Sequence, residues 1–138
     1  MFYKYDPDNS IHVPAPFGRI ITPIFMGDDE VGKNEAFSVH MTEWEPGCCV
    51  DNHSHADSTE AMYCIEGSGI AMVNNVEYEF KPGSMIVAPK NIPHQITNTG
   101  DTLLRVLCIF SPPNTAAGLK QRAMDTIAEA NRLAEQQK

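Results

Sequence analysis

The sequence has few basic residues and no long apolar run. Its 138 residues include 10 lysines and arginines against 18 aspartates and glutamates, which gives a formal net charge of −8. A molecule with this charge repels phosphate backbones and anionic membrane surfaces, so we expect no nucleic-acid or membrane partner. No segment approaches the roughly twenty apolar residues of a spanning helix. The opening MFYKYDPDNS lacks the basic-then-apolar order of a signal peptide, which makes the cytoplasm the expected location.

Cysteine is also sparse, and its four positions do not indicate a disulfide framework. Cys48 and Cys49 are adjacent, whereas Cys64 and Cys108 lie inside apolar runs that are typical of strands. We therefore expect four reduced cysteines that behave as small hydrophobic residues. The length of the chain is enough to bury one ordinary core and too short for two.

Short apolar runs with a period of two dominate the middle of the chain. Turn sequences separate these runs at close intervals, at Pro46-Gly47, Gly67-Ser68-Gly69, Asn74-Asn75, Pro82-Gly83 and Gly100-Asp101. This pattern predicts an all-β fold, an antiparallel sandwich or barrel. In one run, Val76, Tyr78 and Phe80 alternate with two glutamates, which predicts one buried and one solvated face.

The segments on either side differ in composition, and we interpret the chain as one domain with three parts. Residues 1–35 are rich in proline and predict an extended N-terminal arm with short strands, ahead of a barrel at residues 36–112. Residues 113–138 form the third part. From Thr115 to Lys138 the composition and a thin apolar stripe predict an α-helix packed on the outside of the barrel. The stripe consists of Leu119, Ala123, Ile127 and Leu133.

Three histidines and one glutamate form the group of residues that carries chemistry. His53 and His55 are two residues apart, so on a strand both imidazoles point to the same face. Glu60 follows a short loop that returns a carboxylate to that face, and His94 lies on a later strand. Three imidazoles and a carboxylate are a metal-binding set. We therefore expect all four to hold one divalent metal ion, Fe(II), Zn(II), Mn(II) or Ni(II), with Glu60 also a candidate catalytic base.

The spacing around these residues resembles the two-motif signature of the cupin superfamily. The first motif is glycine, five residues, His-X-His, four residues, glutamate, six residues and glycine, and it is complete over residues 47–67. The second motif covers residues 83–98, with Asn91 in place of its second glycine. Asparagine tolerates the left-handed backbone conformation, so Asn91 can serve the same turn. The resemblance implies a cupin jelly roll, which is a double-stranded β-helix.

A second, local similarity points to one branch of small cupins. The segments EAMYCIEG at residues 60–67 and CIFSPP at residues 108–113 resemble the ectoine synthase family. The His53-Ser54-His55 pair departs from that family's pattern. The likeness keeps non-oxidative ring closure and elimination among the reactions that this site can be expected to run.

Strand parity predicts which side chains line a substrate pocket. Residues two and four positions after Glu60 or His94 share the inward face of the same strand. The pocket residues expected on this basis are Met62, Cys64, Ile96 and Asn98. A mixed wall of this kind suits a small, largely apolar substrate.

The sequence offers few other charged or histidine side chains that could belong to the site. Arg19, Lys90 and Arg105 are the cations available to hold an anionic group, and each is expected to be a surface charge. Arg105 alternates with an apolar face, which predicts that it lies outside the cavity. His12 and His40 have no metal-binding company in the sequence and are left out of the site.

Two classes of function follow from these patterns. The first is a metal-dependent enzyme acting on a small molecule, with a dioxygenase slightly ahead of isomerase or lyase chemistry. The alternative is a non-catalytic barrel that binds or senses a metal or a small ligand. The arm and the exposed sheet edges make a homodimer the expected assembly.

Overall fold

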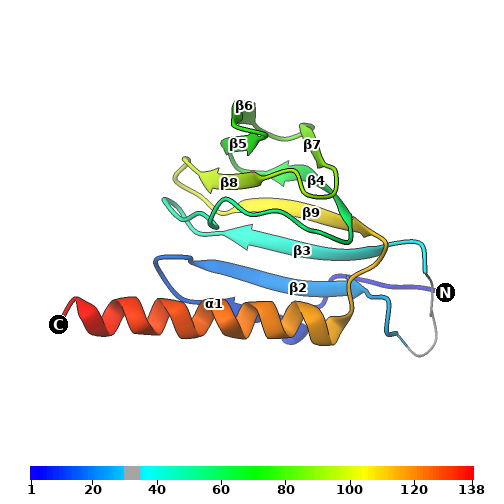
Figure 1. Ribbon diagram of the computed structural model, residues 1–138, viewed down its shortest axis with the longest axis horizontal. Helices are drawn as coiled ribbons and strands as arrows, with labels where there is room; N and C mark the ends of the chain where they lie inside the picture. Colours follow the sequence, from blue (N-terminus) through cyan, green and yellow to red (C-terminus); the bar gives the residue numbers. More distant parts are fainter. Residues whose placement is uncertain (30–34) are drawn as a thin grey trace.

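In the residues that it describes, 1–29 and 35–138, the computed structural model contains two antiparallel sheets that face each other (Figure 1). The larger sheet has the order β1-β2-β3-β9-β4-β7, and the smaller has the order β6-β5-β8. The strand bounds are β1 Ile11–Val13, β2 Arg19–Phe25, β3 Ser38–Trp44, β4 Thr59–Glu66, β5 Gly69–Val73, β6 Val76–Phe80, β7 Met85–Ala88, β8 His94–Asn98 and β9 Leu104–Ser111. A short 3-10 helix, η1, covers Pro7–Asn9. This arrangement is the jelly roll that the sequence predicts.

The main core lies between the two sheets and follows the alternation of each strand. On β9, Leu104, Val106, Cys108 and Phe110 are all buried, as their parity predicts. Arg105 points to the opposite side, where its Nε donates to Glu43 at 3.1 Å. The prediction that Arg105 lies outside the cavity is therefore confirmed.

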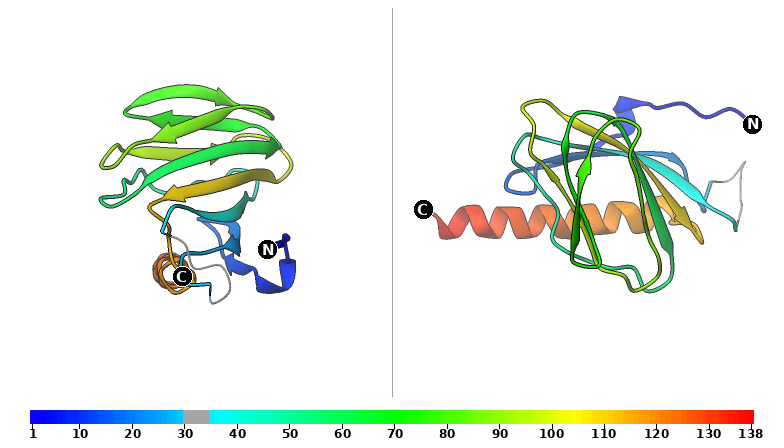
Figure 2. Two further views of the ribbon diagram at one scale, coloured as in Figure 1. Left: turned by 90° about the vertical axis from the view of Figure 1, so that its right-hand side faces the viewer. Right: turned by 90° about the horizontal axis from the view of Figure 1, so that it is seen from above.

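Strand β6 differs from the prediction of one fully buried face. Phe80 is completely buried, but Val76 and Tyr78 are about half exposed, at 50% and 51%. Val76 and Tyr78 are exposed because β6 is the edge strand of the smaller sheet and lies farthest from α1 (Figures 1 and 2). Alternation alone does not reveal whether a second layer covers a strand.

The N-terminal segment is part of the larger sheet. Strand β2 pairs with β3 along its length, and β1 pairs with β2, so both strands extend the sheet at one edge. Residues 30–34, at the end of the predicted arm, lie outside the described residues. A second apolar cluster joins the segment to the C-terminal helix and contains Val13, Ile21, Met26, Leu119 and Ala123.

The C-terminal helix, α1, covers Ala116–Gln136 and lies along β1 and β2 (Figure 1). Thr115 caps it by accepting from the Gly118 N–H at 2.9 Å, a preferred role for threonine. Asp28, from the N-terminal segment, accepts from the Ala116 N–H at 2.6 Å. This hydrogen bond lowers the pKa of Asp28 and ties the segment after β2 to the start of the helix.

Two further findings concern the cysteines and the helices. All four cysteines are free, and Cys48, Cys64 and Cys108 are buried while Cys49 is half-buried. Within the described residues, no helix combines the length and apolar character needed to span a lipid bilayer.

Candidate metal centre and cavity

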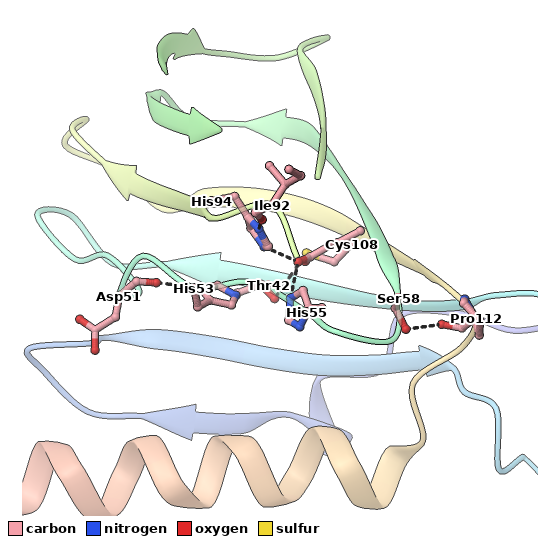
Figure 3. Close-up of polar contacts among 10 residues, drawn as sticks. Thr42, Asp51, His53, His55, Ser58, Ile92, His94, Cys108 and Pro112 are labelled. Carbon is pink, nitrogen blue, oxygen red and sulfur yellow. Dashed lines mark hydrogen bonds and ion pairs between the residues drawn. The ribbon is translucent and has the colours of Figure 1, made fainter. Parts of the chain in front are cut away.

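The four predicted ligands lie together in the folded chain. One ligand atom from each of His53, His55, Glu60 and His94 lies within 4.8 Å of the others. Glu60 Oε2 is 2.9 Å from His55 Nε2 and 2.8 Å from His94 Nε2. In Figure 3 the three imidazoles converge from the loop before β4 and from β8. A set of three imidazole nitrogens and one carboxylate oxygen this close together has the composition and the size of a metal site.

Backbone hydrogen bonds between the two motifs hold this geometry. The His53 N–H donates to the His94 carbonyl oxygen at 3.1 Å, and the His94 N–H donates back to His53 at 2.8 Å. Asn91 has a φ of 64° and donates its N–H to the His55 carbonyl oxygen at 2.8 Å. The prediction that Asn91 adopts the left-handed conformation is confirmed.

The ring orientation of two histidines is fixed by carbonyl groups. His53 Nδ1 is 2.7 Å from the Asp51 carbonyl oxygen, and His94 Nδ1 is 3.0 Å from the Ile92 carbonyl oxygen (Figure 3). Because a carbonyl oxygen only accepts, Nδ1 carries the proton in both rings. The Nε2 atom of each ring is thereby directed into the group, as the outer contacts of metal-binding histidines usually arrange.

The electrostatics of the group favour an ionised Glu60 carboxylate. Burial alone would raise the pKa of Glu60, but hydrogen bonds from His55 and His94 outweigh it and lower the pKa to about 2. Burial acts to lower the pKa of His94, yet its hydrogen bond to Glu60 gives a net increase. The pKa of His53 is lowered by burial, so this imidazole is readily neutral. A divalent cation would replace the protons that these atoms share.

The group opens into a cavity of about 410 Å³. Its walls come from β2, β3, β4, β8 and β9, from the loop at residues 50–55 and from helix α1. This volume falls in the range of small-molecule sites. The helix therefore closes one side of the cavity in addition to packing against the sheet.

The structure divides the predicted pocket residues into two pairs. Met62 and Ile96 line the cavity. Cys64 does not, because it is fully buried in the core between the sheets, and burial raises the pKa of its thiol. Asn98 donates to the carbonyl oxygens of Trp44 and Thr102, each at 2.8 Å, so its amide holds a turn. The inclusion of Cys64 and Asn98 in the pocket was wrong.

His40 lines the cavity, in contrast to the prediction that it lies outside the site. It is 5% exposed and stacks on Phe110 with ring centroids 5.6 Å apart. Burial lowers the pKa of His40 to about 4, so the ring is neutral at neutral pH. Its Nδ1 is buried and has no hydrogen-bond partner within the described part of the chain. His40 alternates along β3 in step with Thr42 and Trp44, which also line the cavity, and this parity could have predicted its inward direction.

Two arginines also line the cavity, and one corrects an expectation. Arg19, predicted to be a surface charge, is half-buried on β2, and its Nη2 donates to Thr126 Oγ1 at 3.3 Å. Arg122, on α1, is a cavity residue that the sequence pattern did not indicate, and its guanidinium lies 5.9 Å from the centre of the Phe110 ring. Lys90 and His12 are exposed and lie outside the cavity wall.

Comparison with known proteins assigns the family. The cupin domain family matches residues 40–110 of this chain. The chain therefore belongs to the cupin family.

Its relatives include several L-ectoine synthases. The L-ectoine synthase of Rhodococcus erythropolis is 38% identical over 94 residues, which are 67% of this chain and 66% of that enzyme. The L-ectoine synthase of Vibrio campbellii is 30% identical over 68% of this chain and 70% of the enzyme. The chain thus spans about two thirds of the length of these relatives. The solved structure of ectoine synthase from P. lautus has a TM-score of 0.71 at 23% identity and shares the fold over 88% of this chain and 86% of that one.

Proposed function

We propose that this chain is a metal-dependent enzyme of the lyase type, which acts on a small molecule by non-oxidative elimination or ring closure. The observation that carries the proposal is the group of four ligand atoms within 4.8 Å of one another, at the wall of a 410 Å³ cavity. The L-ectoine synthase relatives support lyase chemistry over the dioxygenase that the sequence ranked slightly first.

In this proposal His53, His55, Glu60 and His94 hold one divalent metal ion. Fe(II), Zn(II), Mn(II) and Ni(II) all accept such a donor set. When bound, the ion supplies Lewis acidity toward a substrate oxygen or nitrogen. Because the low pKa of Glu60 keeps its carboxylate ionised, this residue is available both as a ligand and as a proton acceptor.

The remaining cavity residues position the substrate and exclude water. Met62, Ile96 and Phe110 supply apolar surface, which suits the carbon skeleton of a small metabolite. His40 is neutral and its Nδ1 has no partner among the described residues, so it is free to hydrogen-bond to a substrate. Such a contact orients the substrate without adding charge.

The test is a turnover measurement on L-ectoine, the compound in the names of the relatives. Purified protein is incubated with L-ectoine or with its ring-opened hydrolysis product, and interconversion is followed by NMR. The account predicts metal-dependent interconversion or metal-dependent dehydration of a related acyclic compound, lost in Glu60→Gln. Stoichiometric metal with no turnover of such compounds would favour the alternative of a binding or sensing protein. Oxygen consumption during turnover would favour a dioxygenase instead.

We also propose that the chain forms a homodimer. The outer face of β4 and β7 carries an exposed apolar patch that consists of Tyr63, Ile65, Met85 and Val87. Tyr63 and Met85 are register partners across the two strands, so the patch is continuous. Contiguous apolar surface of this kind supports association. The cytoplasmic location stays a prediction.

A further inference from the structure

Arg19 and Arg122 are cations without an anionic partner inside the cavity wall. Neither forms an ion pair in the described ranges, whereas Arg105 pairs with Glu43 and Arg132 pairs with Glu129. Acidic residues outnumber basic ones by 18 to 10 in this chain, so partners are plentiful. Among the arginines of the described chain, the two that form no ion pair are thus the two that line the cavity.

Burial makes this arrangement costly for Arg19, which is half-buried, whereas Arg122 is exposed on α1. Arg19 Nε is buried and has no hydrogen-bond partner within the described residues. Burial lowers the pKa of Arg19 and outweighs the charges of Cys108 and Glu60, which raise it, while the charge of Arg122 adds to the lowering. An arginine nonetheless stays charged in proteins, and an unsatisfied buried donor destabilises the fold. A bound anion would remove that cost.

A hydroxyl group on α1 ties the Arg19 side chain to the helix turn that carries Arg122. Thr126 Oγ1 accepts from Arg19 Nη2 at 3.3 Å and donates to the Arg122 carbonyl oxygen at 2.9 Å. The acidic residues nearby on α1 have hydrogen-bond partners other than the two arginines. Asp125 accepts from Gln121 at 2.9 Å, and Glu129 pairs with Arg132.

Phe110 connects the arginine side of the cavity to the metal centre. The Arg122 guanidinium lies 5.9 Å from the centre of its ring, and His55 meets the same ring edge-on with centroids 4.9 Å apart. One small molecule can therefore reach from the arginines to the ligand group along the aromatic surface.

We propose that the substrate carries a carboxylate that Arg19 and Arg122 bind together, with its reacting end directed toward His53, His55, Glu60 and His94. Only the placing of the reacting end rests on the proposed function. Two guanidinium groups match the planar, two-oxygen geometry of a carboxylate. Arg19 is on β2 and Arg122 is on α1, so segments outside the matched cupin domain at residues 40–110 determine the substrate class.

A carboxylate fits better than a phosphate. Phosphate sites commonly use backbone N–H groups of a glycine-rich loop or of a helix N-terminus. Within the described chain, the cavity wall contains no glycine, and its first residue from α1 is Leu119, beyond the opening of the helix. The cation pair is therefore the main anion-binding element.

The test is an NMR titration of the full chain, as purified, with butyrate, its uncharged analogue butyramide, and inorganic phosphate. The variants are Arg19→Met, which keeps the buried stem, Arg122→Gln at an exposed helix position, and Lys120→Gln as a control with the same change in charge on α1. We expect millimolar butyrate to bind, butyramide and phosphate to bind more weakly, and each arginine variant to lose on the order of 10- to 100-fold in affinity. Lys120→Gln stays within about twofold.

Several outcomes would overturn the inference. These are equal binding of butyrate and butyramide, no butyrate binding, tighter binding of phosphate, or unchanged butyrate affinity in Arg19→Met and Arg122→Gln. The metal content of each sample is measured in parallel. Protein without metal that still discriminates butyrate through the arginines would refute the proposed function and leave the carboxylate site standing.

Discussion

His53 and His94 exchange two backbone hydrogen bonds across an isolated antiparallel bridge, which places one histidine of each cupin motif opposite the other. Their ring centroids are 4.5 Å apart. The metal centre thus lies where the two motifs meet. The bridge uses only backbone atoms, so it does not depend on either imidazole ring. Replacing a ring therefore removes a ligand without removing the bridge.

His53→Ala and His94→Ala should each lower metal affinity by more than about 100-fold, because loss of a ligand exceeds the 10- to 100-fold effect of losing an outer contact. His12→Ala is the matched control, since His12 is exposed on β1 and lies away from the cavity. Metal content after dialysis, measured by elemental analysis, checks this. Retention of wild-type metal by both ligand variants would exclude the site.

The turn at Asn91 gives a stability prediction. Its φ of 64° is costly for a residue with an ordinary side chain, so Asn91→Ala should destabilise the fold by about 1 kcal/mol. Asn91→Gly restores the glycine of the motif and should be as stable as wild type or more so. Urea unfolding of the two variants distinguishes them, and equal destabilisation by Ala and Gly would contradict this reading.

Buried His40 predicts a loss of stability in mild acid. Its pKa is about 4 when folded and 6.5 when unfolded, so the unfolded chain binds more protons between these values. Stability should be unaffected by His40 above pH 6.5 and should fall by about 3 kcal/mol between pH 6.5 and 4. Glu60, with a pKa of about 2 against 4.5, contributes a separate loss below pH 4.5.

Chelator-treated protein is used for this measurement, so that metal release does not contribute. His40→Gln removes the titrating group and should abolish the loss of stability between pH 6.5 and 4, whereas His12→Gln at an exposed position should not. An identical acid response in His40→Gln and wild type would show that another group is responsible.

The patch on β4 and β7 predicts the assembly state. Wild-type protein should be a dimer by size-exclusion chromatography with light scattering at micromolar concentration. Met85→Glu places a charge on a side chain that is 54% exposed within the patch and should yield monomers. Met124→Glu, at a 49% exposed position on α1, should remain dimeric. A monomeric wild type would refute the dimer.

Some features could be predicted from the sequence because they depend on local spacing. His53 and His55 share a face through the two-residue period of an extended segment, and Thr115 and Asn91 act through their own backbone neighbourhoods. Such features need no knowledge of which strands are neighbours. The four-residue metal group followed from them together with the family signature.

The arginine side of the cavity depends on contacts between distant segments. Arg19 on β2 and Arg122 on α1 both line the cavity, and the contact from Arg19 to Thr126 across helix and sheet is one that no local pattern indicates. Asn98 shows a different limit, since parity identifies its inward face but not the two carbonyl groups that use its amide. The parity of a strand predicts the direction of a side chain, whereas its hydrogen-bond partners are determined by the tertiary fold.

The most direct test of the central claim is anomalous diffraction from crystals of protein loaded with Zn(II) or Mn(II). The account predicts one anomalous peak, bounded by the imidazoles of His53, His55 and His94 and the carboxylate of Glu60, at the wall of the cavity. A peak at other residues, or no peak in protein that fails to retain metal in solution, would contradict the assignment of this chain as a metal-dependent cupin.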